Sequence, residues 1–96
     1  MILEVAQLSI RPATEAGFER IFPEAVRLLA ASPGYLSHEL HRSIESPSRY
    51  ALMVRWRTLE DHTVGFRGSA AFGEWRAQLA PFLAAPPVVE HFRLSG

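Results

Sequence analysis

The sequence predicts an α+β fold of the ferredoxin-like type, in which a βαββαβ chain forms a four-stranded antiparallel sheet with both helices on one face. Three observations lead to this prediction. Four runs of residues have the apolar, β-branched or alternating character of strands. Two other segments repeat apolar residues at the three-and-four spacing of a helix, one before and one after the central pair of strands. With 96 residues, the chain is expected to form one domain, residues 1–96.

The first strand is predicted over residues 2–10, where the pattern alternates until a proline, Pro12, which cannot donate to a β-ladder. A helix follows and ends at Ser32-Pro33-Gly34. Its apolar stripe consists of Phe18, Ile21, Phe22, Ala25, Leu28 and Leu29. Because Pro23 lacks a backbone donor, the helix is either kinked there or starts close to Phe22.

A β-hairpin is predicted next, with strands at residues 35–44 and 49–57 joined by the Pro- and Ser-containing connection 45–48. A short helix begins directly after it. Thr58 and Asp61 have the spacing of a capping box, with Asp in place of the usual Glu. The helix face that follows consists of Leu59, His62, Thr63 and Phe66.

Gly65 and Gly68 weaken this helix, and Ser69 is placed to cap a second segment. The apolar stripe of that segment consists of Phe72, Trp75, Leu79 and Phe82. One bent helix and two helices in series fit the pattern equally well. Pro86-Pro87 ends the helical region, and residues 88–94 are predicted as the last strand.

The third strand carries apolar residues on both of its faces: Leu52, Val54 and Trp56 at one parity, and Ala51 and Met53 at the other. The helices cover only one face of the sheet. A second subunit's sheet is the expected cover for the other face, which predicts a homodimer with two-fold symmetry.

Composition excludes several classes of protein. The ten basic residues, all Arg, balance ten acidic residues, so the net charge is zero and no broad positive field favours nucleic acid. The absence of Cys excludes disulfide scaffolds and zinc-cysteine sites. No apolar run approaches membrane-spanning length and no basic leader opens the sequence, so a cytoplasmic protein is the default expectation.

Several motifs distributed over essentially the whole chain resemble those of the antibiotic biosynthesis monooxygenase superfamily, the dimeric α/β-barrel proteins. They are Pro33-Gly34-Tyr35, Arg49-Tyr50, Val54-Arg55-Trp56, Leu59-Glu60-Asp61-His62, Phe66-Arg67 and Val89-Glu90-His91-Phe92. The resemblance implies two subunits packed sheet to sheet, the last strand reaching toward the partner, and a pocket between sheet and helices in each subunit.

Some members of this superfamily oxidise polycyclic phenols to quinones without metal or flavin, whereas others degrade haem. The haem-degrading members rely on an Asn in the first strand, a Trp in the second helical region and a His further along it. The corresponding positions hold Gln7 or Ala6, then Phe66, then Trp75 or Arg76. None of the three residue types is present, which argues against haem cleavage and leaves no cofactor implied.

His62 and Arg67 are the candidate catalytic residues. An imidazole near neutral pKa can take a phenolic proton, and the helix face sets His62 beside Leu59 and Phe66. Arg67 can hold a phenolate, carboxylate or superoxide-like anion with its planar fork. The structural alternatives are a half-buried histidine bonded to backbone and an arginine that pairs with Glu60 or Glu74.

The candidate substrate-binding residues are aromatic: Trp56, Phe66, Phe72 and Trp75. The same stripe also suits a plain hydrophobic core. His38 and His41 fall on opposite faces of one strand, so a shared site would need His91 of a partner's last strand. No ligand spacing supports a metal site, and Tyr35 and Tyr50 are interpreted as structural.

The resemblance and these candidate residues together imply a cofactor-independent monooxygenase acting on a small aromatic substrate of the phenol, hydroquinone or polyketide type. The chemistry requires a base, an anion-stabilising donor and a dry cavity. Two alternatives remain open. One is a non-catalytic dimeric module that binds a small hydrophobic ligand, and the other is a scaffold that only dimerises.

Overall fold

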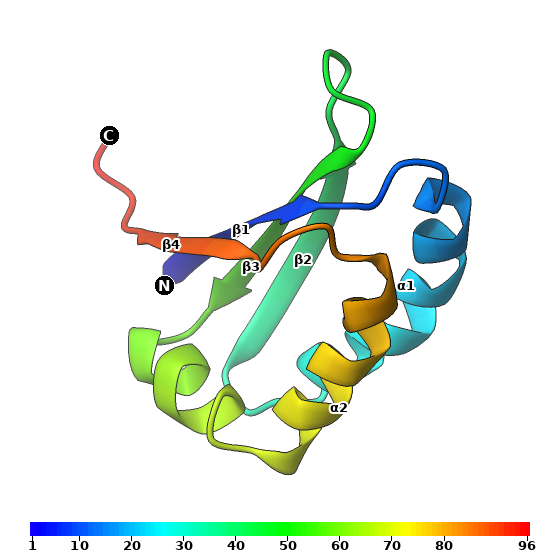
Figure 1. The fold of residues 1–96 in the computed structure, drawn as a ribbon. Helices are drawn as coiled ribbons and strands as arrows, with labels where there is room; N and C mark the ends of the chain where they lie inside the picture. Colours follow the sequence, from blue (N-terminus) through cyan, green and yellow to red (C-terminus); the bar gives the residue numbers. More distant parts are fainter.

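The computed structural model describes residues 1–96 as a four-stranded antiparallel sheet with the helices on one face (Figure 1). The elements are β1 (Ile2–Ser9), α1 (Glu15–Ala30), β2 (Tyr35–Arg42), β3 (Arg49–Trp56), the π-helical segment η1 (Asp61–Phe66), α2 (Ala70–Leu79), the 3-10 turn η2 (Ala80–Phe82) and β4 (Val88–Phe92). The strand order is β2-β3-β1-β4. The predicted ferredoxin-like βαββαβ fold is confirmed.

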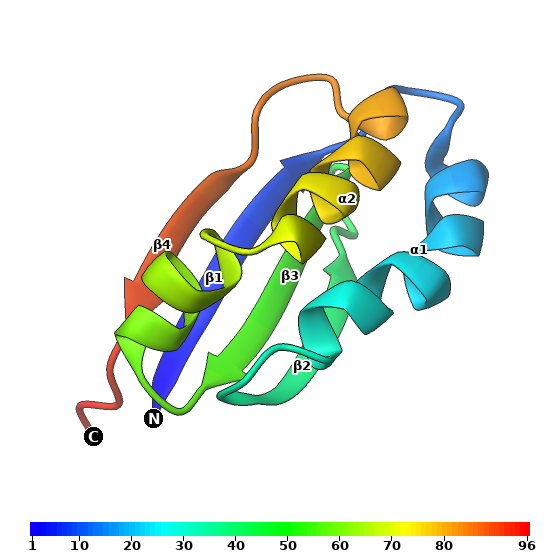
Figure 2. The same cartoon turned by 90° about the horizontal axis from the view of Figure 1, so that it is seen from below.

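The core lies between the sheet and the two main helices, which run side by side across it (Figure 2). From β1, the inward-facing residues Ala6 and Leu8 are buried, and from β3, Leu52, Val54 and Trp56 are buried. These residues alternate with outward-facing ones, as the two-residue period of a strand requires. The same alternation directs Glu4 inward, which places one carboxylate on the hydrophobic face.

Helix α1 begins at Glu15 and continues to Ala30 with Pro23 inside it. The alternative of a helix start close to Phe22 is therefore wrong. Thr14 precedes the helix, and its carbonyl accepts a hydrogen bond from the Phe18 amide at 3.0 Å, so the first turn is established well before the proline. Burial of the predicted apolar stripe on the sheet outweighs the one backbone donor that Pro23 lacks.

The predicted capping box is confirmed. The Thr58 amide donates to Asp61 Oδ2 at 3.2 Å, and the Asp61 amide donates to Thr58 Oγ1 at 3.1 Å. The residues that follow form the π-helical η1 and a separate α2, so two helices in series are correct. Ser69 is the N-cap of α2, but its hydroxyl donates to the Phe66 carbonyl at 2.6 Å and does not cap an amide.

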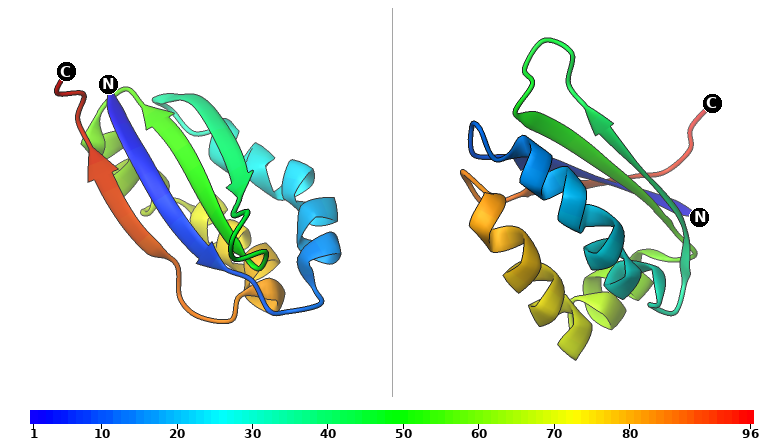
Figure 3. Two further views of the ribbon diagram at one scale, coloured as in Figure 1. Left: turned by 90° about the horizontal axis from the view of Figure 1, so that it is seen from above. Right: turned by 90° about the vertical axis from the view of Figure 1, so that its right-hand side faces the viewer.

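The opposite face of the sheet carries no helix (Figure 3). Register places Leu3, Val5, Met53, Val88 and Phe92 on this face. The predicted strand ends were slightly too long: the hairpin strands stop at Arg42 and Trp56 and the last strand at Phe92. None of the helices combines the length and apolar character needed to span a bilayer.

Candidate functional site

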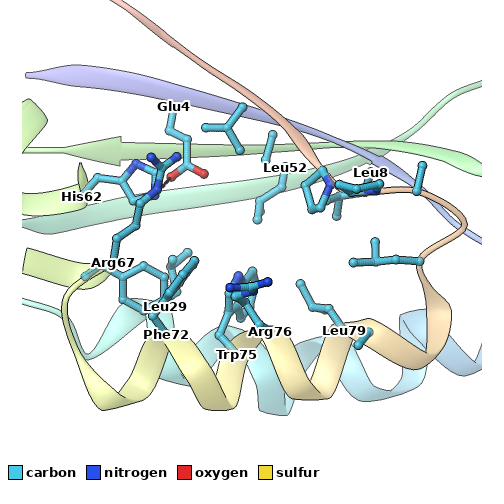
Figure 4. A pocket seen from close by; sticks show the side chains of 18 of the residues that line it. Glu4, Leu8, Leu29, Leu52, His62, Arg67, Phe72, Trp75, Arg76 and Leu79 are labelled. Atoms are coloured by element: carbon cyan, nitrogen blue, oxygen red, sulfur yellow. Dashed lines mark ion pairs between the residues drawn. The ribbon is translucent and has the colours of Figure 1, made fainter. Parts of the chain in front are cut away.

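A pocket of about 580 Å³ lies between the sheet and α2 (Figure 4). Ala6, Leu8 and Leu52 form its floor on β1 and β3, and the α2 residues Phe72, Trp75 and Leu79 form the opposite wall. The segment 83–87, which links η2 to β4, completes the lining. The walls are mostly hydrophobic, and polar groups enter only at Glu4, His62, Arg67 and Arg76. This is the composition of a small-molecule site.

Glu4 lies at one end of the pocket and is only 4% exposed. Its Oε1 atom accepts a hydrogen bond of 2.9 Å from Trp56 Nε1. The other oxygen, Oε2, accepts no hydrogen bond and is not sealed in the protein, so it opens into the pocket. A carboxylate with one satisfied oxygen and one open oxygen can accept a proton or a hydrogen bond from a ligand.

His62 lies against Glu4 and is 3% exposed. Its Nε2 is 3.4 Å from Glu4 Oε1, and its Nδ1 is 2.8 Å from Nε2 of His91. The imidazole stacks on the indole of Trp56, with ring centroids 5.1 Å apart. The π-helical geometry of η1 brings both His62 and Phe66 inward. Three chain segments, β1, η1 and β4, thus contribute to one row of titratable side chains.

The charges of this row depend on burial. The pKa of His62 is lowered from 6.5 to about 4, mainly by burial and further by the positive charge of Arg67 and by the neighbouring His91. The pKa of His91 is lowered by burial and by Arg67. Burial raises the pKa of Glu4, while the Trp56 hydrogen bond and Arg67 oppose that rise. Near neutral pH, His62 is therefore an uncharged imidazole beside a carboxyl group of enhanced basicity.

Arg67 and Arg76 supply the positive charge at the pocket. Arg67 forms no ion pair with Glu60 or Glu74, so the structural alternative for this residue is not observed. Arg76 lies over the ring of Phe72, with its guanidinium carbon 5.6 Å from the centroid. Both guanidinium groups remain available to an anionic group on a ligand.

Of the six residues predicted for the site, five line the pocket: His62, Arg67, Phe66, Phe72 and Trp75. Trp56 does not. It is fully buried behind His62, and its indole supports Glu4 from the side of the sheet. Trp56 lies outside the pocket lining because its inward-facing ring packs against His62 and Phe66 of η1.

Glu4 was missed as a site residue by sequence reasoning. It shares its strand parity with Ala6 and Leu8, so it is a charged residue at a core-facing position, and such residues are candidates for functional sites. The sequence pattern connected His91 only with a shared site across two subunits, and within the chain it is hydrogen-bonded to His62. Only the tertiary fold brings β4 beside η1, so no local signal marks this pair.

The remaining histidines lie elsewhere. His38 Nδ1 is 2.6 Å from the Tyr35 hydroxyl, and His41 Nε2 is 2.8 Å from Glu39 Oε1. They lie on opposite faces of β2, as predicted from alternation. No group of three or more His, Asp or Glu side chains has the geometry to hold a metal ion.

Comparison with known proteins identifies the family. The family model described as antibiotic biosynthesis monooxygenase matches residues 1–78. The chain belongs to the antibiotic biosynthesis monooxygenase family. The resemblance noted in the sequence motifs is thereby confirmed, and the pocket between sheet and helices is the site in which this member of the family holds its titratable residues.

Two relatives match nearly the whole chain. The uncharacterized protein YczJ of Bacillus subtilis (strain 168) is 43% identical over 93 residues, covering 97% of this chain and 98% of its own length. A structure from Bordetella bronchiseptica, named for the same monooxygenase family, is 41% identical with a TM-score of 0.93, covering 98% of this chain and 96% of its own.

A third structure extends the comparison at the level of the fold. SnoaB of Streptomyces nogalater, described as a cofactor-independent oxygenase and solved as a mutant, has a TM-score of 0.82 and 18% identity. The match covers 99% of this chain and 93% of SnoaB. At that identity, the likeness shows that the two proteins share a fold.

Proposed function

We propose that this protein is a monooxygenase that oxidises a small, flat aromatic substrate, such as a hydroquinone or an anthrone, without a cofactor. The observation that carries the proposal is the form of the pocket: apolar aromatic walls that end at an open carboxylate oxygen beside a neutral imidazole, with two guanidinium groups at the edge. Membership of the family and the fold shared with a cofactor-independent oxygenase support the same reaction class.

The substrate class follows from the lining. Phe66, Phe72 and Trp75 line the cavity, and Phe66 packs edge-to-face with the other two rings; such aromatic walls suit contact with a flat aromatic molecule. Arg67 and Arg76 favour a substrate that carries, or acquires, negative charge on oxygen. A phenol that becomes a phenolate during the reaction meets both requirements.

The proposed reaction begins with loss of the phenolic proton to the Glu4–His62 pair, while Arg67 stabilises the phenolate. The phenolate passes one electron to dioxygen, which gives a phenoxyl radical and superoxide. Their recombination forms a carbon–oxygen bond and a peroxide anion, which takes up one proton in place of the one removed at the start. Loss of water from the resulting hydroperoxide leaves a carbonyl group. For an anthrone, the sum is a CH₂ group plus O₂ giving a C=O group plus H₂O.

The role of His62 differs from that of a free base. A lone imidazole whose pKa is about 4 is a weak base for a phenol, which normally ionises near pH 10. Glu4, whose pKa is raised by burial, stands 3.4 Å away and is the stronger acceptor. We assign proton removal to Glu4 Oε2, with His62 as the partner that takes the proton onward.

A homodimer is part of the proposal. Leu3, Val5, Met53, Val88 and Phe92 form an apolar area on the face of the sheet that the helices leave open. Val88 is 63% and Phe92 45% exposed in the single chain. A second copy placed sheet to sheet covers these side chains and is the economical way to remove them from water.

Oxygen consumption tests the enzyme hypothesis. A panel of hydroquinones and anthrones is offered to the wild type, Glu4→Gln, His62→Ala and the control His41→Ala, which changes an exposed histidine on the other face of the sheet. Protein-dependent uptake that falls about 100-fold in the first two variants and persists in the control is expected. Uptake no faster than in buffer for every substrate would contradict the proposal.

The second candidate is a ligand-binding module without turnover. The observation in its favour is the low basicity of His62, which leaves the imidazole neutral and hydrogen-bonded in the resting protein. Under this hypothesis, an anionic aromatic probe such as anilinonaphthalene sulfonate binds the wild type, loses affinity in Arg67→Met and Arg76→Met, and no aromatic substrate supports oxygen uptake.

A further inference from the structure

The side chains of Glu4, His62 and His91 form an unbroken row from the pocket to the edge of the sheet. Glu4 is at the pocket end, His62 is in the middle, and His91 is partly exposed on the edge strand β4. Each consecutive pair is joined through a defined atom: Glu4 Oε1 to His62 Nε2, then His62 Nδ1 to His91 Nε2. Both ring nitrogens of His62 are thus engaged.

We propose that Glu4, His62 and His91 form a proton relay that carries the proton taken from a ligand in the pocket to solvent at the β4 edge. Glu4 is the group that contacts the ligand, and His62 and His91 act through it as relay residues. The inference rests on the proposed function, because a relay is useful only where the pocket takes up a proton.

One transfer along the row takes up one proton at Glu4 and releases one proton at His91. In the loaded state, Glu4 carries the proton and donates it to His62 Nε2, His62 Nδ1–H donates to His91 Nε2, and His91 Nδ1–H faces solvent. Transfer along the row moves one proton across each hydrogen bond and releases one from His91 Nδ1. In the discharged state, Glu4 is ionised, His62 carries its proton on Nε2, and His91 Nε2–H donates to His62 Nδ1.

The two contacts of the relay differ in length: the His62–His91 pair is within hydrogen-bond distance, and the Glu4–His62 pair is farther apart. The 2.8 Å contact between the two imidazoles is already a short hydrogen bond. Glu4 Oε1 and His62 Nε2 are 3.4 Å apart, and the proton from the ligand arrives on Oε2, so the carboxyl group must turn to bring the protonated oxygen within hydrogen-bond distance of Nε2. Trp56 holds Oε1 in place at 2.9 Å and so limits that rotation.

Burial and the charges facing the row together keep its imidazoles neutral. Arg67, from the turn before α2, faces all three groups and lowers the pKa of His62 and of His91. It also opposes the rise that burial imposes on the pKa of Glu4. Arg76 on α2 is the other charged residue of the pocket lining. Neutral imidazoles can change tautomer by passing a proton through, without storing a charge in the protein interior.

The route matters because the pocket closes to water when it is filled. An aromatic ligand that occupies the apolar cavity displaces the water that otherwise reaches Glu4 Oε2. A proton on Glu4 then has no exit through the pocket, and the row through His62 leads to His91, which lies on the edge strand β4 and outside the pocket lining.

Imidazole tautomers in the protein without ligand provide the test. Two-dimensional nitrogen–proton spectra of the wild type, labelled with ¹⁵N-histidine, distinguish protonated from unprotonated ring nitrogens. We expect His62 to change from the Nε2–H to the Nδ1–H form, and His91 from the Nε2–H to the Nδ1–H form, together, at the pH where Glu4 takes up its proton. Tautomers that stay fixed across that pH, or an imidazole that becomes charged there, would overturn the relay.

Glu4→Gln provides a second measurement. Its amide oxygen can accept from Trp56 while its NH₂ group donates to His62 Nε2, which imitates the protonated carboxyl group. His62 and His91 are therefore expected in the Nδ1–H forms at every pH above their own titration, whereas His38 and His41 keep the wild-type spectra. Wild-type tautomers in this variant would also overturn the proposal.

The two hypotheses fail separately. Coupled tautomers without oxygen uptake would refute the monooxygenase and leave the relay in place. Oxygen uptake that depends on Glu4, together with fixed tautomers, would support the monooxygenase and refute the relay.

Discussion

The indole of Trp56 and the carboxyl group of Glu4 are joined by a hydrogen bond of 2.9 Å, although 52 positions separate the two residues in the chain. Trp56 is fully buried, and Glu4 is nearly so. The bond ties the end of β3 to β1 directly below His62, whose ring stacks on the same indole. The position of the Glu4 carboxyl group is therefore determined by the two sheet strands β1 and β3.

Replacing Trp56 by Phe removes this donor. A buried carboxyl group then loses its partner, and we expect the free energy of unfolding at pH 7 to fall by about 2 kcal/mol. The pKa of Glu4 is expected to rise further, because the hydrogen bond opposes the effect of burial. Urea denaturation and carboxyl NMR measure the two effects. Trp75→Phe is the matched control, since it changes the other tryptophan and should leave the Glu4 titration unchanged.

Stability should depend on pH through His62. Its folded pKa of about 4 lies below the ordinary 6.5, so the unfolded chain binds a proton first as the pH falls. Stability attributable to His62 is therefore lost between about pH 6.5 and pH 4, on the order of 3 kcal/mol in all. Glu4 acts in the opposite sense, because its raised pKa lets the folded protein take up that proton first.

Urea unfolding of the wild type and His62→Gln from pH 4 to pH 7 measures this dependence. In His62→Gln, the free energy of unfolding should fall much less between pH 7 and pH 4 than in the wild type. His41→Gln, at an exposed histidine, should follow the wild type. Parallel curves for the wild type and His62→Gln would show that another group governs stability in this range.

Gly34 is expected to tolerate no side chain. Its φ is +87°, and a Cβ atom there would collide with the carboxyl group of Asp61, which belongs to the capping box. We expect Gly34→Ala to reduce stability by about 2 kcal/mol or more. Gly73→Ala, inside α2 with open space around the new methyl group, should instead raise stability by about 0.5–1 kcal/mol. Thermal unfolding measures the change in melting temperature of each variant. Equal changes in Gly34→Ala and Gly73→Ala would contradict this prediction.

Filling the mouth of the pocket should block ligand binding without affecting the fold. Ala85 is exposed and lines the pocket in the 83–87 segment. Ala85→Phe is expected to weaken binding of anilinonaphthalene sulfonate about tenfold or more, with stability unchanged within about 0.5 kcal/mol. Ala77→Phe, on an exposed part of α2 outside the pocket, is the control. Affinity is measured by fluorescence titration. Equal affinities in the two variants would show that the probe binds outside this pocket.

The proposed dimer should depend on the apolar area of the open sheet face. Met53 lies near its centre, opposite Val5 on β1. Burying a new carboxylate between two sheets is costly, so Met53→Glu is expected to shift the protein to a monomer. Sedimentation velocity measures the change, and Ala77→Glu adds the same charge on a helix. A dimer that persists in Met53→Glu would direct the search for the interface to another surface.

Much of the fold was predictable because it depends on local patterns. Apolar periodicity identified all four strands and both helical regions, and the Thr58–Asp61 capping box was recognised before its hydrogen bonds were seen. Of the two alternatives at Pro23, the later helix start is wrong because burial of a helix face against the sheet, which is not a local property, outweighed the local cost of the proline.

The site was less accessible to sequence reasoning. His62 and Arg67 were predicted from local features: the helix face that His62 shares with Leu59 and Phe66, and the anion-binding chemistry of an arginine directly after that face. Glu4 and His91 belong to β1 and β4, and nothing in either strand indicates that the two flank the same imidazole. Trp56 was recognised as an aromatic residue near the site, but its direction, behind the pocket and toward Glu4, follows from the register between β1 and β3.

The sequence by itself determined the order of the elements, the apolar face of each and the family to which the chain belongs, because periodicity, caps and motifs are properties of neighbouring residues. Only the tertiary structure decided which titratable groups meet. A strand's parity sets the face on which a side chain lies, whereas its partner is chosen by the packing of segments far apart in the chain, and that packing converts an isolated glutamate and two histidines into one connected row.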